Sequence, residues 1–176
     1  MKAIRNVLVV VALCAFAPAQ SHSNPAAEQR NFNLEDAVQK RVDLSDAELA
    51  ALAQDDLMSQ EMKNDPPIVT LTNEGLAATV VHLCGSAERD LVVVGDGAPF
   101  IGANVGPFWI IRDLPAGPAV VLSEITLGLT IQSSRSNRCL NVEAFAATAV
   151  EGTTTDFRFN GQKYVVYKQK TAKLGQ

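Results

Sequence analysis

The chain has 176 residues, of which 47% are hydrophobic and 19% are charged, a balance that suits one globular domain and excludes a disordered chain. Its formal net charge is −4 and no stripe of Lys and Arg stands out, which argues against nucleic-acid binding. The same composition lacks the basic amphipathic face that holds a protein on an anionic membrane.

Residues 1–19 predict a secretory signal peptide. Lys2 and Arg5 precede the apolar run 7–16, which is too short to span a bilayer, so no membrane span is expected. Small residues stand at positions −3 and −1 of a cleavage site before Gln20. We therefore expect an exported bacterial protein, periplasmic or secreted.

Two alternatives to a cleaved leader remain open. The apolar run could be a buried N-terminal strand, or Cys14 could carry a lipid anchor, although Leu13 is bulkier than the residue that usually precedes a lipidated cysteine. We favour the cleaved leader. Residues 20–32 are then a flexible lead-in, polar and interrupted by Pro25.

Residues 33–64 predict a short helical segment at the start of a single domain, 33–176. Asn33 can cap a helix over residues 34–41, and Ser45 with Glu48 forms a capping box before a second helix. This second helix should end near residues 64–67, where two prolines follow Asn64-Asp65. Its apolar residues fall on one stripe: Leu49, Leu52, Ala53 and Leu57. The stripe either docks a partner or, as we favour, covers one face of a sheet.

The rest of the domain, residues 68–170, predicts β-structure, because runs rich in Val, Ile, Thr and aromatic residues alternate with turn residues. The expected strands are 68–72, 76–83, 91–95, 107–112, 119–125, 127–132, 140–145, 154–159 and 163–168. The strand 107–112 is apolar on both faces, so we predict a central strand in which Trp109 is largely buried. The fold class is mainly β with a short N-terminal helical segment (α+β).

The stretch His82-Leu83-Cys84-Gly85-Ser86-Ala87-Glu88-Arg89-Asp90-Leu91-Val92-Val93 resembles the FG-GAP/VCBS-type repeat, in which a loop Asp-x-Asn-x-Asp-Gly-x-x-Asp binds calcium and leads into an apolar strand. On that pattern His82, Cys84 and Ser86 occupy the first three ligand positions, and Asp90 alone keeps a carboxylate. Calcium needs several oxygen ligands. The resemblance therefore implies the loop shape without a metal site.

A second polar loop, residues 134–142, enters a strand in the same way and suggests an internal repeat. The corresponding positions are Asp90 with Asn141, Arg112 with Arg158, and Val120-Val121 with Val165-Val166. Two units, each resembling a propeller blade, are too few to close a propeller. We expect a twisted antiparallel sheet or an open sandwich built from two blade-like units.

From about residue 42 to residue 168 the chain also resembles uncharacterised exported bacterial proteins. The recognisable pieces are Gly102-Ala103-Asn104-Val105-Gly106-Pro107-Phe108-Trp109 and Phe157-Arg158-Phe159-Asn160-Gly161-Gln162-Lys163-Tyr164. The resemblance implies a fold and an envelope location, and no activity. In the second piece, Asn160-Gly161 predicts a type I′ turn, with Phe157 and Phe159 expected on opposite faces of their strand.

The candidates for chemistry are few. His82 and Cys84 lie two residues apart, so they could begin a zinc site or a Cys-His nucleophile pair, but no further ligand completes such a site. We favour a strand-end histidine and a disulfide between Cys84 and Cys139, because the oxidising environment of an exported protein promotes disulfide formation. This disulfide would stabilise the fold by about 4 kcal/mol. No metal or cofactor is predicted.

The loop 102–107 is the candidate binding site, through Gly102, Asn104 and Gly106 beside Trp109. The alternative, which we favour, is a structural turn before a buried aromatic strand. The leading hypothesis for function is a non-enzymatic exported β-domain that binds an envelope macromolecule, a protein or a glycan. An inhibitor of a lytic enzyme would be one instance. The rival is a hydrolase or metal-dependent enzyme that uses His82.

Overall fold

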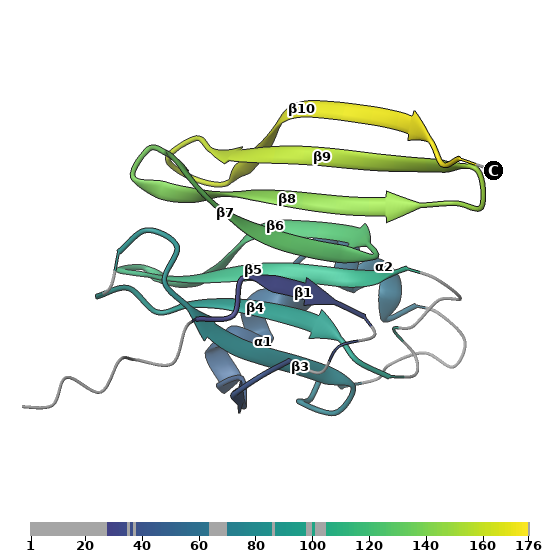
Figure 1. Ribbon diagram of the computed structural model, residues 1–176. Coiled ribbons are helices and arrows are strands. Elements are labelled where there is room, and N and C mark those ends of the chain that lie inside the picture. The colour runs from purple at the N-terminus through teal and green to yellow at the C-terminus, as the bar shows by residue number, and fades with distance from the viewer. Residues whose placement is uncertain are drawn as a thin grey trace, which may run out of the picture.

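The computed structural model describes residues 28–34, 36, 38–63, 70–85, 87–97, 100 and 105–175, so the expected leader, its cleavage position and Cys14 lie outside this part of the chain. Most of the described chain is β-strand, in two open antiparallel sheets of five strands each (Figure 1). Two short helices lie near the N-terminal end. The predicted fold class is confirmed.

The N-terminal sheet has the strand order β2-β3-β4-β5-β6, and the C-terminal sheet has the order β1-β7-β8-β9-β10. The N-terminal sheet contains β2 (Arg41–Val42), β3 (Leu76–Val81), β4 (Asp90–Gly95), β5 (Gly106–Leu114) and β6 (Gly117–Thr126). The C-terminal sheet contains β1 (Asn31–Asn33), β7 (Gly128–Ser136), β8 (Cys139–Ala147), β9 (Glu151–Phe159) and β10 (Tyr164–Lys173). The helices are α1 (Asp46–Ala53) and α2 (Asp56–Glu61).

The strand order agrees with two related units. Strands β3 to β6 form one antiparallel meander and strands β7 to β10 form another, and each is extended at its first strand by a short N-terminal strand. The positions that suggested a repeat fall on matching strands. Asp90 and Asn141 lie near the starts of β4 and β8, and Arg112 and Arg158 lie on β5 and β9.

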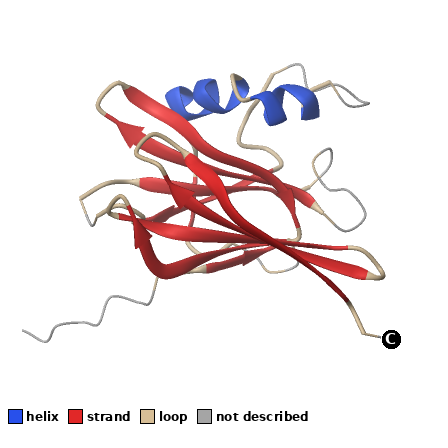
Figure 2. Cartoon of the chain, turned by 90° about the horizontal axis from the view of Figure 1, so that it is seen from above, coloured by secondary structure: helices blue, strands red, loops and turns tan. Residues whose placement is uncertain are grey.

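The described chain forms three layers, because the N-terminal sheet is covered on both faces. One face packs against the C-terminal sheet, and this core includes Val92, Phe108, Ile110, Leu129, Val142 and Phe157. The other face packs against the helices, and this core includes Leu52, Met58, Val93, Trp109 and Ile111. Figure 2 shows both helices on one side of the strands. Leu49, Leu52 and Leu57 of the predicted apolar stripe therefore pack on this face of the sheet, whereas Ala53 is exposed.

The predicted helix over residues 34–41 is wrong, since the described residues there form no helix. Asn33 does cap a local turn: its Oδ1 accepts the N–H of Asp36 at 2.6 Å. The chain then returns to the sheets, because Val38 is buried in the core between them and Lys40, at φ +51°, turns into β2. Burial in the core between the sheets outweighs the local helical pattern.

Two further boundaries differ from the prediction. The capping box of Ser45 and Glu48 is present, but the helix that follows breaks at Gln54, because Asp55 caps a second helix by accepting the N–H groups of Leu57 and Met58. The predicted strand 68–72 is not found in residues 70–72; the remaining residues of that strand lie outside the described chain.

The turn between β9 and β10 is also displaced from the prediction. Asn160 is its first residue: its N–H donates to the carbonyl oxygen of Lys163, and its side chain accepts from Gln162 and Lys163. Gly161 alone has a positive φ there, +107°, so the turn is not type I′. Phe157 and Phe159 are both buried in the core between the sheets and thus share one face, as the two-residue period of a strand requires.

Trp109 is fully buried, which confirms the prediction for the central strand β5. Its ring packs edge-on against Phe100, with 6.2 Å between the ring centroids. Its Nε1 donates to Asp55 Oδ1 at 3.0 Å, so the same carboxylate caps α2 and fixes the indole beneath the helices.

Trp109→Ala should destabilise the fold by about 3–5 kcal/mol, because it leaves a large cavity beneath the helices. Trp109→Phe is the matched control: it retains most of the apolar volume but loses the bond to Asp55, so its cost should be clearly smaller. Urea denaturation measures both. A cost below about 1 kcal/mol for Trp109→Ala would show that the helices do not depend on this side chain.

Candidate functional site

The two sheets end in four edge strands, and these differ in length and cover. Strands β1 and β2 have three and two residues. Strand β6 is long but lies against α1, β8 and β10. Glu124 of β6 is partly buried, and this burial raises its pKa. Strand β10 has ten residues, nine of them exposed, and it forms the outer edge of the C-terminal sheet (Figure 1). Among the described strands, β10 therefore offers the long free edge.

Strand β10 is attached to the core at its first residue. Tyr164 is buried, its ring lies 5.4 Å from that of Phe159, and its hydroxyl donates to the Leu140 carbonyl oxygen at 2.7 Å. Burial and the neighbouring Asp90 carboxylate raise the pKa of Tyr164, so the hydroxyl remains a donor. At the other end, the Leu174 N–H donates to the Val150 carbonyl oxygen at 2.9 Å. The strand is thus held at both ends.

The backbone groups of the second half of β10 alternate between β9 and solvent. Leu174 donates to Val150, and Lys173 lies opposite Glu151. Alternate residues of an antiparallel strand bond to the same neighbour. Residues 168, 170 and 172 therefore direct their N–H and C=O groups at β9. Those of Gln169, Thr171 and Lys173 point to the free edge.

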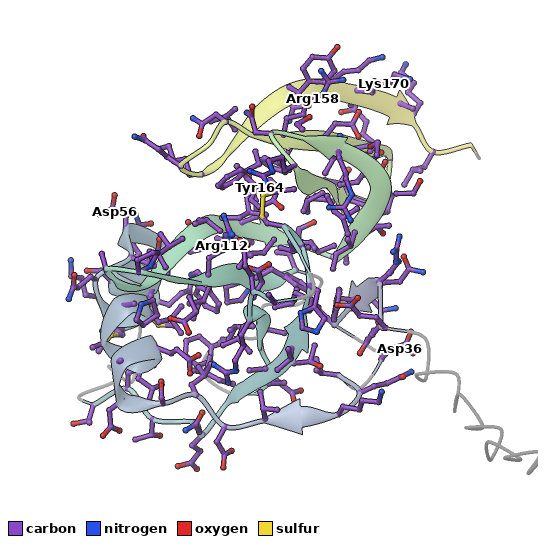
Figure 3. All side chains as sticks on the ribbon, turned by 90° about the vertical axis from the view of Figure 1, so that its left-hand side faces the viewer. Asp36, Asp56, Arg112, Arg158, Tyr164 and Lys170 are labelled. Atoms are coloured by element: carbon purple, nitrogen blue, oxygen red, sulfur yellow. A yellow bond between two sulfur atoms is a disulfide. The ribbon has the colours of Figure 1, made fainter. Side chains whose placement is uncertain are left out.

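The side chains of β10 are basic on the face turned away from the N-terminal sheet. Phe157 of β9 faces the core, so its neighbour Asp156 faces away, together with Lys168 opposite it. Lys170 lies opposite Thr154 and shares this outer face. Figure 3 shows Lys170 and Arg158 projecting from the β9–β10 hairpin.

A bulge adds an aromatic residue to this edge. The register between β9 and β10 shifts between Val166 and Lys168, so Tyr167 has no partner in the ladder. The guanidinium of Arg158 lies over the Tyr167 ring. Tyr167 is 57% exposed and Val166 is 59% exposed, so the edge carries apolar surface beside its lysines.

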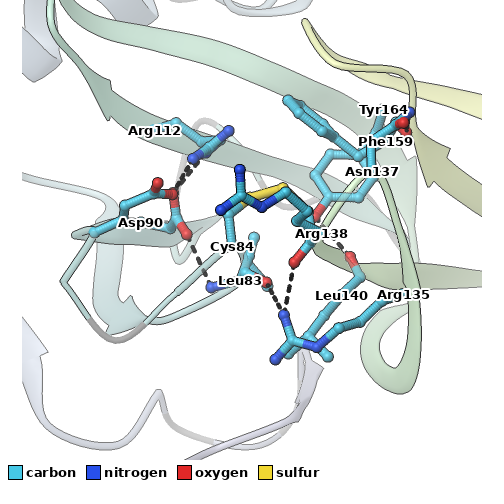
Figure 4. The surroundings of a disulfide bond; sticks show 12 residues. Leu83, Cys84, Asp90, Arg112, Arg135, Asn137, Arg138, Leu140, Phe159 and Tyr164 are labelled. Carbon is cyan, nitrogen blue, oxygen red and sulfur yellow. Dashed lines mark hydrogen bonds and ion pairs between the residues drawn. A yellow bond between two sulfur atoms is a disulfide. The ribbon is translucent and has the colours of Figure 1, made fainter.

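A buried ion pair fixes the hairpin on the rest of the molecule. Arg112 Nε donates to Asp90 Oδ1 at 2.8 Å, and Asp90 Oδ2 accepts the N–H of Leu83 at 2.8 Å (Figure 4). Asp90 is fully buried and Arg112 nearly so. The guanidinium also pairs with Glu88 and lies 5.1 Å from the centroid of the Phe159 ring, which packs on Tyr164.

The disulfide Cys84–Cys139 is present beside this ion pair and joins the loop after β3 to the first residue of β8. It therefore links the two sheets. The Leu140 N–H donates to the Leu83 carbonyl oxygen at 2.8 Å, which adds a backbone bond at the same junction. Arg135 Nη1 donates to that oxygen too, at 3.2 Å.

A second ion pair ties α1 to the same loop. Arg89 pairs with the buried Glu48, which also accepts the Ser45 N–H at 2.7 Å. Burial alone would raise the pKa of Glu48, but the hydrogen bonds from Ser45 and the charge of Arg89 outweigh it and lower that pKa.

The structure does not assemble a catalytic or metal centre from the predicted candidates. Cys84 is consumed by the disulfide, and the His82 ring Nδ1 lies 2.8 Å from the Glu88 carbonyl oxygen, to which it donates. Cys84, Glu88 and Asp90 place ligand atoms within 4.8 Å of one another, but both carboxylates already bind Arg112.

The predicted binding loop is only partly described. Gly102 and Asn104 lie outside the described residues. Gly106 is buried in β5, where an added Cβ would approach Leu34 Cδ2 to 2.7 Å, and Trp109 is buried beneath the helices. Close packing thus accounts for Gly106 and Trp109, while a binding role for the loop stays a prediction.

A shallow groove of about 640 Å³ lies between α1 and the start of β6. The polar lining residues are Gln54, Asp55 and Asp56. The remaining lining residues are small or apolar: Ala47, Ala50, Ala51, Ala116, Gly117, Pro118, Ala119 and Val120. Asp55 is already engaged by Trp109 and by α2. The groove presents few groups that could orient a ligand.

No family model matches this chain, and comparison with curated proteins and with solved structures finds no match either. The resemblances to FG-GAP repeats and to exported bacterial proteins therefore stay predictions. Neither helix of the described chain is long and apolar enough to cross a membrane.

Strand β10 was not predicted as a candidate site, although the sequence carries a signal for it. Five Lys and Arg residues and no Asp or Glu fall in residues 157–176, within a chain of net charge −4. The expectation of no basic stripe was therefore too broad. The strand was also predicted to end at residue 168, whereas it continues to Lys173.

Breaking the buried ion pair should be costly. Asp90→Asn leaves the Arg112 charge buried with the partly exposed Glu88 as its remaining partner, so we expect a loss of about 3–5 kcal/mol in the free energy of unfolding. Glu88→Gln is the control, since it removes the exposed carboxylate of the same cluster and should cost under about 1 kcal/mol. Equal costs in urea denaturation would contradict this division.

Calcium should not bind at the loop before β4. Millimolar calcium is expected to leave the melting temperature unchanged, because stabilisation requires binding to the native state and the Glu88 and Asp90 carboxylates are paired with Arg112. Magnesium serves as the control for general ionic effects. A rise of several degrees that a chelator reverses would overturn this prediction.

Proposed function

We propose that the protein is an exported, non-enzymatic binding module of the cell envelope that takes an extended segment of another protein along β10. The observation that carries the proposal is the free edge: β10 ends its sheet and is exposed over nine of ten residues. An added strand would satisfy the unpaired backbone groups of Gln169, Thr171 and Lys173.

A protein segment fits this edge better than a glycan. The free groups of β10 alternate along the strand, and another extended backbone carries donors and acceptors at the same spacing. The exposed Val166 and Tyr167 offer apolar contacts at one end of the edge. A glycan carries hydroxyl groups but lacks this regular spacing, so it would match fewer of the free backbone groups.

Two observations support an exported protein. The leader pattern of residues 1–19 is typical of secretion. The Cys84–Cys139 disulfide fits an oxidising compartment. The enzymatic alternative that uses His82 has lost its partner Cys84 to this disulfide, and no observation favours it.

Immobilised mature protein should capture a partner from envelope extract in a way that depends on the free backbone of β10. Thr171→Pro removes an N–H that points to the free edge and leaves the ladder to β9 intact, so capture should fall at least about tenfold, equivalent to about 1.4 kcal/mol. Thr171→Val is the matched control, because it loses the same hydroxyl, retains the N–H and should capture like wild type.

Thermal melts of both variants check that the fold is unchanged. The amide protons of residues 169, 171 and 173 should also become protected from hydrogen exchange when the captured partner binds. Equal capture by Thr171→Pro and Thr171→Val would contradict docking along this edge.

A further inference from the structure

We infer that the segment taken by β10 is acidic, with carboxylates on alternate residues opposite Lys168 and Lys170, and that it is not a second copy of this chain. This inference rests on the proposed function and specifies the partner of the same site. Positive charge is concentrated at the C-terminal end of the sequence. The basic residues of the C-terminal hairpin are Arg158, Lys163, Lys168, Lys170 and Lys173, and no acidic residue follows Asp156.

The lysines of the edge are only partly compensated by β9, where Lys173 lies opposite Glu151. Lys170 lies opposite Thr154, and Lys168 opposite Asp156, which also accepts a hydrogen bond from Gln132 Nε2 at 3.1 Å. No ion pair of the described chain includes Lys168, Lys170 or Lys173. All three side chains are exposed. Their charges are therefore available to a partner.

The ladder places Lys168 and Lys170 where charge on the added strand has most effect. Because Gln169, Thr171 and Lys173 direct their backbone groups to the free edge, they would form the hydrogen-bonded pairs with a new antiparallel strand. Lys168 and Lys170 would then occupy the non-hydrogen-bonded pairs, in which opposite residues come closest, with Cα atoms about 4.5 Å apart. Opposite charges attract at these positions and like charges repel.

The same geometry disfavours self-association. Antiparallel pairing of β10 with its own copy, centred on Lys170, sets that residue against itself. The register centred on Gln169 sets Lys168 against Lys170, and the one centred on Lys168 sets that residue against itself. Only the register centred on Thr171, among these central ones, keeps the faces aligned without placing two lysines opposite each other, since Lys170 then lies against Ala172. Lysines on an edge strand are a known means of preventing such pairing. The edge therefore discriminates between partners by charge, rejecting its own kind and accepting carboxylates.

The test uses three capped nine-residue peptides in which valine alternates with glutamate, glutamine or lysine, titrated by fluorescence anisotropy. The glutamate peptide should bind about tenfold more tightly than the glutamine peptide, and the lysine peptide more weakly than both. The preference for glutamate should shrink in high salt. It should disappear in the variant Lys168→Gln/Lys170→Gln and persist in the control Lys40→Gln/Lys63→Gln, which removes two exposed lysines elsewhere.

The outcomes separate this inference from the proposed function. If the glutamate and glutamine peptides bind equally and Thr171→Pro weakens both, strand docking stands and the acidic partner is wrong. If the glutamate peptide binds Thr171→Pro as well as Thr171→Val, the lysines form a general anion surface and both conclusions fail. Vesicles containing about 30% phosphatidylglycerol are the test for a lipid ligand. If they bind the protein, and if Lys168→Gln/Lys170→Gln weakens that binding as much as it weakens binding of the glutamate peptide, the surface binds lipid instead.

Failure of all three peptides to bind would also overturn the acidic-strand inference, and the capture experiment with Thr171→Pro would then decide the proposed function by itself. Sedimentation of the free protein should show a monomer. A dimer that becomes more stable in the variant Lys168→Gln/Lys170→Gln would contradict the inference. The occupant of the edge would then be a second copy of the chain, whose binding the lysines weaken without preventing it.

Discussion

The buried ion pair of Asp90 and Arg112 organises the junction at which the two sheets meet. An unpaired charge at this depth would cost several kcal/mol, so β4 and β5 must hold these residues together. Asp90 also binds the Leu83 N–H, and the next residue forms the disulfide to the C-terminal sheet. Arg112 lies over Phe159, which packs on Tyr164, the residue that anchors β10. The position of the free edge therefore depends on an ion pair buried in the other sheet.

The two meanders use matching positions differently, and the layers explain why. Asp90 and Arg112 face the C-terminal sheet, whereas Asn141 and Arg158 alternate with core residues Val142 and Phe157 and so face away from the N-terminal sheet. The units are thus stacked in the same orientation, one on the next, as blades are. The helices cover the open face at one end of the stack. At the other end no described element covers the face, and it carries charged and polar residues such as Arg158, Lys168 and Lys170.

Local sequence patterns predicted the parts of the fold that local forces determine. The strands from Leu76 onward, the capping box at Ser45 and the burial of Trp109 all follow from alternation, capping chemistry and apolar composition. The short strands β1 and β2 could not be predicted, because two or three residues become strands only through their partners β7 and β3. The candidate site was hidden for the same reason: whether a strand lies inside a sheet or at its edge depends on strand order. The aromatic composition around Trp109 suggested a binding site, but Trp109 is buried in the core. Nothing in the local alternation pattern distinguished Lys170, which is exposed on the free edge.

The free edge is ordered before any partner arrives, and this matters for its proposed role. Tyr164 holds one end through the core, and Leu174 holds the other through Val150, with a hydrogen-bonded ladder to β9 between them. Binding then orders only the incoming segment, since β10 already has the conformation that an added strand requires. A partner that is disordered and acidic when free would bear the whole cost of ordering. Its affinity would depend on backbone pairing for strength and on Lys168 and Lys170 for selection, so the two contributions can be removed separately by Thr171→Pro and by loss of the lysines.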